Sequence, residues 1–316
     1  MSVACYAAQT MYTIKQAAER TGIAIPTIRM WERRYGVVSP TRTPGGYRLY
    51  DDDSIARLAA MHYLVERDGW RPSQAADRIR AAEPSDLQEL AAHGRRTEAT
   101  TADEARAEAS TAVEAIVDAA RRLDIGSIDA TLDETFAGQR FESAMDSVVF
   151  PALRGIGDAW TRKELDVARE HAASETIRRR IAHYFDAAAR NAGGSTVVIG
   201  LPAGSRHELG AFAFAVAARR AGMDVVYLGA DVPLDAWRET VRDMDPKAVV
   251  IAVVARDDAR RAAEVIEELR SQGPRVIAVG GPTVDAIPAE LPAVRLPDRI
   301  DDAVALLRDS ISSTAR

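Results

Sequence analysis

The sequence has little of what defines several large classes of protein. Its 316 residues contain one cysteine, Cys5, which excludes an intramolecular disulfide and fits a reducing, cytoplasmic setting. No apolar run approaches the roughly 18 residues that span a bilayer, and the first twelve residues lack the basic and apolar regions of a signal peptide. The chain also lacks the GxGxxG pattern of dinucleotide sites and the Gly-Lys-Ser/Thr of phosphate loops. We therefore expect a cytoplasmic protein without a membrane partner.

The charge is divided unevenly along the chain. The formal net charge is −6, but residues 1–80 contain 12 Lys and Arg against 8 Asp and Glu, which is +4, so the remaining 236 residues carry −10. A length of 316 residues allows two or three domains. A basic first quarter on an acidic chain indicates one module that faces nucleic acid.

The first 80 residues predict two short helices followed by a hairpin. A helix over 12–22 has Thr13 as its N-cap and Gly22 just beyond its end. A second, Arg-rich helix over 26–35 follows after a tight turn, and the two together form a helix-turn-helix. The glycine pair at 45–46 suits the tip of a hairpin, which would form a wing.

Spacing along the second helix separates a core face from an outer face. Ile28 and Trp31 share one face and are predicted to pack on the first helix. After the hairpin, Asp52 or Asp53 is predicted to cap a third helix.

The run YTIKQAAERTGIAIPTIRMWERRYG, with TPGGYRLYDDDSIARL after it, resembles the DNA-binding domain of the mercury-resistance regulator (MerR) family over residues 11–80. The resemblance implies a homodimer on palindromic operator DNA. Arg suits guanine edges and phosphates, and Tyr suits phosphates. The DNA contacts that it implies are Thr27, Arg29, Arg33, Tyr35, Arg42, Tyr47 and Arg48.

The middle of the chain predicts a linker and a helical bundle. Residues 81–108 have few large apolar side chains and are interpreted as a partly helical linker with little core of its own. Residues 109–192 are assigned to a four-helix bundle, because short breaks separate amphipathic segments. These segments are expected at 102–122, 127–138, 140–161 and 164–192.

Residues 194–316 predict an α/β domain. Five apolar runs of strand length alternate with helical patterns, which is typical of a doubly wound, flavodoxin-like parallel sheet. The strands are expected at 196–201, 224–229, 247–254, 275–279 and 293–296, and the helices at 208–221, 234–243, 256–272 and 301–312. The predicted fold class is thus multi-domain: winged helix-turn-helix, four-helix bundle and doubly wound α/β domain.

A loop after the first of these strands carries a possible metal ligand, His207. The pattern His-x-x-Gly, ending at Gly210, with Gly280-Gly281 after a later strand, resembles the cobalamin-binding fold of methionine synthase and the base-off mutases. That resemblance implies that His207 is the lower axial ligand of cobalt and that the glycine pair leaves room for the nucleotide tail. Two positions depart from the family pattern. Ser205 replaces a carboxylate and would orient the imidazole more weakly, and the Ser-x-Leu position falls at 252–254, where Ala252 and Val254 have no hydroxyl.

The bundle contains Trp160, followed after nine residues by Glu170 and His171. By itself this pattern is typical of a core tryptophan and a surface pair. Directly before a cobalamin-type domain, it resembles light-sensing cobalamin regulators of the CarH type. In them the Trp covers the 5′-deoxyadenosyl group, while the Glu and His bind it by hydrogen bonds. Such regulators also place a His beside the Trp as an upper ligand after photolysis, whereas this chain has Thr161.

The resemblances together imply a repressor that responds to light, with adenosylcobalamin controlling assembly into a dimer or tetramer. No nucleophile–base pair or carboxylate pair stands out, so catalysis is not expected. The first alternative is a photoreceptor regulator of the same architecture that binds a bilin or another tetrapyrrole, with or without cobalamin. The second is a cobalamin-dependent methyltransferase or mutase component.

Overall fold

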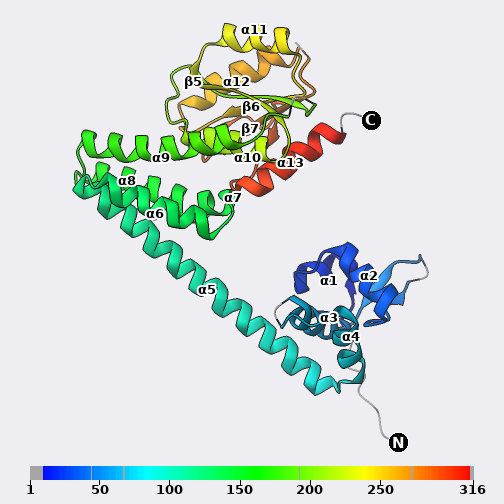
Figure 1. Cartoon of the computed structure of the whole chain (residues 1–316). Helices are drawn as coiled ribbons and strands as arrows, with labels where there is room; N and C mark the ends of the chain where they lie inside the picture. The colour runs from blue at the N-terminus through cyan, green and yellow to red at the C-terminus, as the bar shows by residue number, and fades with distance from the viewer. Residues whose placement is uncertain (1–9, 44, 67, 192, 272, 314–316) are drawn as a thin grey trace, which may run out of the picture. The chain divides into compact units, whose positions relative to one another are not determined.

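The computed structural model describes residues 10–43, 45–66, 68–191, 193–271 and 273–313. Cys5 lies outside the described residues. The chain divides into two compact units, residues 1–105 and 106–316 (Figure 1). Within the described ranges, no helix is both long enough and apolar enough to cross a bilayer.

The first unit is a small helical domain with a three-stranded antiparallel sheet of order β1-β3-β2. Thr13 caps its first helix through a capping box with Gln16, and Gly22 ends that helix with φ of 68°. The elements are β1 (Tyr12–Thr13), α1 (Ile14–Thr21), α2 (Ile25–Tyr35), β2 (Thr41–Arg42), β3 (Arg48–Tyr50), α3 (Asp52–Glu66), α4 (Pro72–Ala81) and the start of α5 (Pro84–Arg122).

The predicted inner face of α2 is confirmed, whereas the predicted N-cap of α3 is wrong. Ile28 and Trp31 are buried together with residues of α1, α3 and α4. The cap of α3 was predicted at Asp52 or Asp53, but the Asp51 carboxylate accepts the Ser54 N–H at 2.8 Å. The cap is therefore Asp51, one residue before the predicted positions, and α3 begins at Asp52. The Asp52 carboxylate accepts the Tyr12 hydroxyl instead.

Helix α5 differs from the predicted linker. It is one helix of 39 residues, which includes nearly all of 81–108 and the first expected bundle segment. The apolar side chains of Leu87 and Ala91 are buried in the first unit, Leu87 among its core residues. Few large apolar residues were needed here, because Ala, Glu and Arg are strong helix formers even without a core.

The second unit begins with a helical bundle built from the end of α5 and five further segments. Its third expected helix contains a five-residue π segment, whose Asp146 carboxylate accepts the Ile300 N–H at the start of the last helix. The segments are α6 (Ile125–Gly138), α7 (Phe141–Ala144), η1 (Met145–Val149), α8 (Phe150–Thr161) and α9 (Val167–Ala187).

The remainder of this unit is the predicted parallel sheet, with strand order β5-β4-β6-β7-β8. Helices α10 and α13 cover one face and α11 and α12 the other, and α9 lies along α10 (Figure 1). The strands are β4 (Thr196–Pro202), β5 (Asp224–Val232), β6 (Ala248–Ala252), β7 (Val276–Gly280) and β8 (Val294–Arg295). The helices are α10 (Leu209–Arg220), α11 (Leu234–Met244), α12 (Asp258–Leu269) and α13 (Ile300–Ser313), with a 3₁₀ turn, η2 (Val284–Ala286).

The strand order fixes where a ligand can bind. Numbered by their order in the sequence, the strands lie in the order 2-1-3-4-5, so the order in which strands are added to the sheet reverses between β4 and β6. In doubly wound sheets the crevice lies outside the carboxyl ends of the strands at this reversal. The loops after β4 and β6 are therefore the expected walls of the cofactor site.

Candidate functional site

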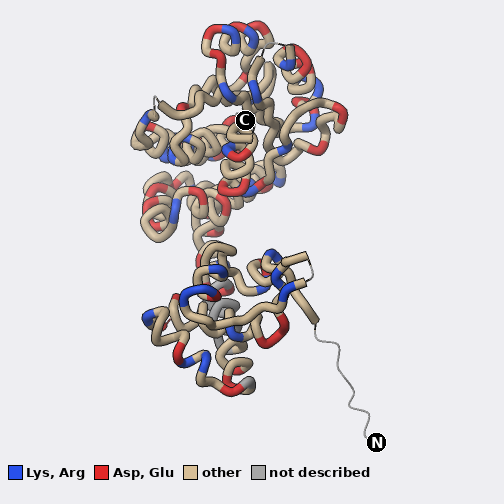
Figure 2. The backbone as a smooth tube through the Cα atoms, turned by 90° about the vertical axis from the view of Figure 1, so that its right-hand side faces the viewer, with Lys and Arg blue, Asp and Glu red and all other residues tan. Residues whose placement is uncertain are grey.

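The predicted DNA-contacting residues of the first unit lie on α2 and on the wing. Arg29 and Arg33 are exposed and four residues apart on α2, which puts them on one face of the helix. Arg42 and Tyr47 are exposed on the wing, whereas Thr27 and Tyr35 are half-buried at the two ends of α2. Charges of both signs are interspersed along the helices of both units (Figure 2). The positions of individual arginines on α2 and the wing are therefore a better guide to DNA contacts than the net charge.

Arg48 has a second role that sequence reasoning missed. Its Nε donates to both carboxylate oxygens of Glu32 on α2, at 3.0 and 3.1 Å. The buried Tyr50 hydroxyl donates to the same carboxylate, and burial, with the charge of Glu32 next, raises the pKa of Tyr50 to about 12. Glu32 therefore connects the wing to α2.

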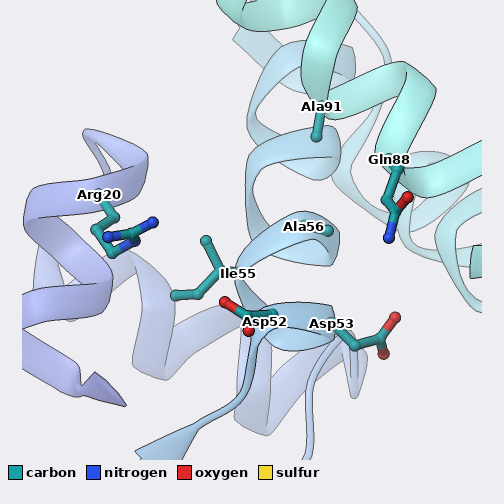
Figure 3. Close-up of a pocket in the computed structure, with 7 residues that line it drawn as sticks. All are labelled: Arg20, Asp52, Asp53, Ile55, Ala56, Gln88 and Ala91. Carbon is teal, nitrogen blue, oxygen red and sulfur yellow. The ribbon is translucent and has the colours of Figure 1, made fainter. Parts of the chain in front are cut away.

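A cavity of about 630 Å³ lies elsewhere in the first unit, between α1, α3 and the start of α5 (Figure 3). Its walls carry Arg20 on one side and Asp52 and Asp53 on another. None of the predicted DNA-contacting residues lines it.

In the second unit the predicted lower-site residues gather at the carboxyl ends of three adjacent strands. Ser205 and His207 follow β4, Ala252 ends β6 and Gly280 ends β7. The His207 imidazole is exposed. The remaining predicted residues of this region are Gly210 in the first turn of α10, Val254 just after β6, and Gly281 just after β7.

The backbone conformation at position 281 requires glycine, independently of any ligand. Its φ is 121°, and a Cβ atom there would lie 2.5 Å from the Val253 carbonyl oxygen. Gly280 accepts the Val253 N–H at 2.8 Å through its carbonyl. The glycine pair therefore lets the loops after β6 and β7 approach each other closely.

Ser205 does not have the environment that the sequence predicted. The hydroxyl that was expected to orient the His207 imidazole donates to the Asp258 carboxylate at 2.9 Å. Both side chains are buried, with 3% and 5% of their surface exposed. Asp258 was missed because it follows β6, more than fifty residues away, and only the sheet order brings it to the loop.

The residue after His207 connects this loop to the bundle. The Tyr227 hydroxyl donates to the Glu208 carboxylate at 3.1 Å, and burial raises the pKa of this phenol. The Tyr227 ring stacks on Phe212 at 4.9 Å between centroids, and Phe185 of α9 packs against both rings. Arg178, two turns before Phe185 on α9, is within electrostatic reach of Glu208. Helix α9 therefore passes beside the His207 loop.

The three predicted upper-site residues lie at the turn between α8 and α9. Trp160 is 50% exposed, which contradicts the interpretation of this side chain as bundle core. His171 Nδ1 lies 2.6 Å from the Glu170 carboxylate, whose other oxygen accepts the Ser174 hydroxyl at 2.7 Å. A carboxylate on Nδ1 orients the ring and leaves Nε2 open to solvent or a ligand.

Ion pairs fix this turn to the end of α5. Glu164 accepts from Arg162 and Arg121, each at 2.6 Å, and these hydrogen bonds lower the pKa of its carboxyl to about 2. Arg169 donates to the Arg121 carbonyl at 3.0 Å. The Thr161 hydroxyl also has a partner within α8, because it donates to the Gly157 carbonyl at 2.9 Å. Hydrogen bonds and ion pairs therefore connect the turn after Trp160 to the end of α5.

Comparison with known proteins identifies the class of each part. Residues 12–81 match the MerR HTH family regulatory protein model, and residues 112–184 and 195–308 match two B12 binding domain models. The chain is similar to the HTH-type transcriptional repressor CarH of Myxococcus xanthus, with 32% identity over 86% of this chain and 88% of that one. It is also similar to the repressor CarA of the same organism, with 29% identity over 85% of each chain.

Among solved structures, the Methanosarcina barkeri monomethylamine corrinoid protein has the same fold in its region of overlap. The TM-score is 0.52 at 15% identity, over 61% of this chain and 95% of that one. Together these findings define a MerR-type regulator with cobalamin-binding domains. The chain belongs to the family of CarH-type HTH transcriptional repressors. It is accordingly a cobalamin-dependent transcriptional regulator that binds DNA.

The residues of the second unit fit this cofactor. Among the side chains that the structure describes, no group of three or more His, Cys, Asp or Glu could hold a metal ion. A lone exposed imidazole such as His207 suits a metal that brings its own equatorial ligands, as cobalt does in a corrin ring. The matched families indicate cobalamin and none of them indicates a bilin.

Proposed function

We propose that this protein is a light-responsive repressor that holds adenosylcobalamin between its bundle and its α/β domain. In this proposal the cofactor sets the homo-oligomeric state, as a dimer or tetramer, and thereby the affinity for operator DNA. The observation that carries it is the exposed Trp160 in the last turn of α8, followed by the Glu170–His171 pair in the first turns of α9, with ion pairs on the intervening turn. A large aromatic ring that a bundle leaves exposed is suited to covering an apolar ligand.

On the lower side, His207 would hold cobalt through the loop after β4. Glu208, Tyr227 and Phe185 support this assignment, because they bring the loop beside α9. His171 stands seven residues before Arg178, which is about 10 Å along the helix axis. Helix α9 thus passes beside the His207 loop and also carries His171. A ligand held between the bundle and the α/β domain would contact both.

On the upper side, Trp160 would pack on the adenosyl group, while Glu170 and His171 offer hydrogen bonds to its hydroxyls and base. Bound adenosylcobalamin supplies one piece of chemistry here, a cobalt–carbon bond that light breaks. Once the adenosyl group has left, Trp160 loses its packing partner. Because Glu164 and Arg169 connect the turn to Arg121, α5 would respond to this change. Residues of this chain therefore transmit the signal without catalysing a reaction, and the regulator would act in the cytoplasm.

Absorption spectra of the purified protein with adenosylcobalamin, before and after illumination, test this proposal. We expect cobalamin bands that change with light, together with a change of elution volume in size-exclusion chromatography. A strong additional long-wavelength band would favour the bilin alternative. One elution volume and one DNA affinity, with or without the cofactor and in dark or light, would refute the proposed switch.

For DNA binding, we expect Arg29 and Arg33 to read base edges from the outer face of α2. Replacing either with Ala should cost about 1–3 kcal/mol of binding free energy and relax sequence specificity. Arg34→Ala is the matched control, since it removes the same charge from a different face of the helix. Competition binding with operator and scrambled DNA measures both quantities. Equal effects of all three variants, on both DNAs, would contradict the assignment.

For the wing, Arg48→Ala should weaken binding to all sequences alike and reduce the salt dependence, if Arg48 contacts phosphate. The ion pair with Glu32 provides a sharp control. Glu32→Gln keeps the Arg48 charge but weakens the tie between wing and helix. If Arg48 binds phosphate, Glu32→Gln retains most of the affinity and the salt slope. Should both variants lose affinity equally with an unchanged slope, Arg48 acts only by fixing the wing.

A further inference from the structure

The loop that carries His207 is anchored by a buried carboxylate from a different segment of the chain. Asp258 Oδ2 accepts the Ser205 hydroxyl at 2.9 Å, the Ala255 N–H at 2.8 Å and the Val254 N–H at 3.3 Å. Burying a carboxylate is unfavourable unless hydrogen bonds replace its water. Three donors on one oxygen meet that condition and hold Asp258 in a single orientation.

A second carboxylate holds the backbone of the same loop from the other side. The Gly204 N–H donates to Asp231 at 2.6 Å, and the Asp231 N–H donates to the Ser205 carbonyl at 3.0 Å. Gly204 has φ of 82°, and the Arg261 guanidinium covers the position where a Cβ atom would lie. The backbone on each side of the Ser205 side chain is thus fixed by β5, and the side chain itself by α12.

The Ser205–Asp258 hydrogen bond lies where doubly wound sheets bind their ligands, at the reversal of the strand order. Ser205 follows β4 and Asp258 opens α12 after β6, so their hydrogen bond joins the two strands between which the strand order reverses. His207 stands two residues beyond Ser205 and is exposed. A fixed base with a protruding imidazole is the geometry that a single axial ligand needs.

We propose that Asp258 is a positioning residue for His207, acting through Ser205. In the pattern of the cobalamin-binding family, a carboxylate occupies the position of Ser205 and serves the His directly. In this chain the carboxylate is Asp258 of α12, and it binds Ser205 rather than the His207 imidazole. The inference rests on the proposed role of His207 as the lower ligand.

The test uses the full-length protein and adenosylcobalamin, with three readouts: affinity by absorbance titration, the spectrum of the bound cofactor, and thermal unfolding without cofactor. Asp258→Ala should weaken cobalamin binding by about tenfold, the usual effect of losing a partner behind a metal ligand. It should also raise the share of bound cobalamin without the signature of imidazole ligation. Ser205→Ala should act in the same direction with a smaller effect. Asp257→Ala, which removes the same charge from the exposed neighbour, is the control and should match the wild type.

An exchange of the two residues separates positioning from general stability. Ser205→Asp alone places two carboxylates in contact and should weaken binding. The double variant Ser205→Asp/Asp258→Ser restores a hydroxyl–carboxylate pair in the reverse order, and should recover the imidazole-ligated spectrum. If Asp258→Ala does not fold, Ser205→Ala and this exchange decide the question.

Wild-type affinity and spectrum in both Asp258→Ala and Ser205→Ala would overturn the proposal. So would weaker binding with a fully imidazole-ligated spectrum, because the pair would then support the fold without orienting His207. His207→Ala distinguishes the two levels of inference. An unchanged spectrum there refutes the lower-ligand role itself, whereas a changed spectrum beside a wild-type Asp258→Ala refutes only the positioning role.

Discussion

Replacing Trp160 with Ala is expected to leave cobalamin bound but to remove its effect on oligomeric state and DNA affinity. A ligand shifts an equilibrium between two arrangements only as far as its affinities for them differ. Trp160, half-exposed at the α8–α9 turn, is the side chain whose packing would depend on the adenosyl group. Size-exclusion runs in dark and light, with and without adenosylcobalamin, measure the effect directly. In the variant all four runs should give one elution volume.

Leu123→Ala is the matched control for this experiment. Leu123 is 48% exposed at the α5–α6 turn of the same bundle, so its loss removes a similarly exposed apolar group from another site. The control should keep the wild-type response. If Trp160→Ala also keeps it, the ring does not sense the ligand, and if Trp160→Ala loses cobalamin altogether, the ring serves binding instead.

Dialysis of the illuminated wild-type protein, followed by its absorption spectrum, tests the consequence of Thr161. Its hydroxyl is bonded within α8 and offers no nitrogen to cobalt, so the illuminated protein has only His171 as an imidazole at this turn. We therefore expect the corrin to be held less firmly after illumination and to be lost on dialysis. Retention of the corrin in illuminated His171→Ala would show that another group holds it.

His207→Ala is expected to shift the spectrum of bound cobalamin towards the form ligated by its own base or by water, and to weaken affinity. The imidazole contributes a bond to cobalt that Ala cannot replace. Because the carboxylate behind this loop lies beyond Ser205 rather than on the imidazole, the loss should be smaller than in relatives with a directly bonded carboxylate. Absorbance titration of wild type and variant measures both effects.

His183→Ala supplies the control, since it removes another exposed imidazole, from α9, that is assigned no ligand contact. Its spectrum and affinity should equal those of the wild type. Equal spectra for all three proteins would reduce His207 to an ordinary loop residue, although the family membership would stand.

Local sequence signals determined most of the secondary structure. Thr13 with Gln16, and Gly22 with its positive φ, mark the ends of α1 as predicted. Strands β4, β6 and β7 were predicted correctly because continuous β-branched runs are typical of strands buried on both faces. The linker, predicted to be partly helical, is part of the continuous helix α5, because helix propensity decides in the absence of a core.

For the sites, the sequence by itself predicted candidate ligand contacts, because Trp160, the Glu170–His171 pair and His207 match family patterns in residue type and spacing. Only the tertiary structure decided what holds them. Asp258 reaches Ser205, and Glu32 reaches Arg48, across 53 and 16 residues of chain. Such contacts depend on strand order and helix packing, which bring distant segments together, and no local pattern in the sequence records that distance. The exposure of Trp160 was decided in the same way, because periodicity assigns a face to a side chain but not what covers that face.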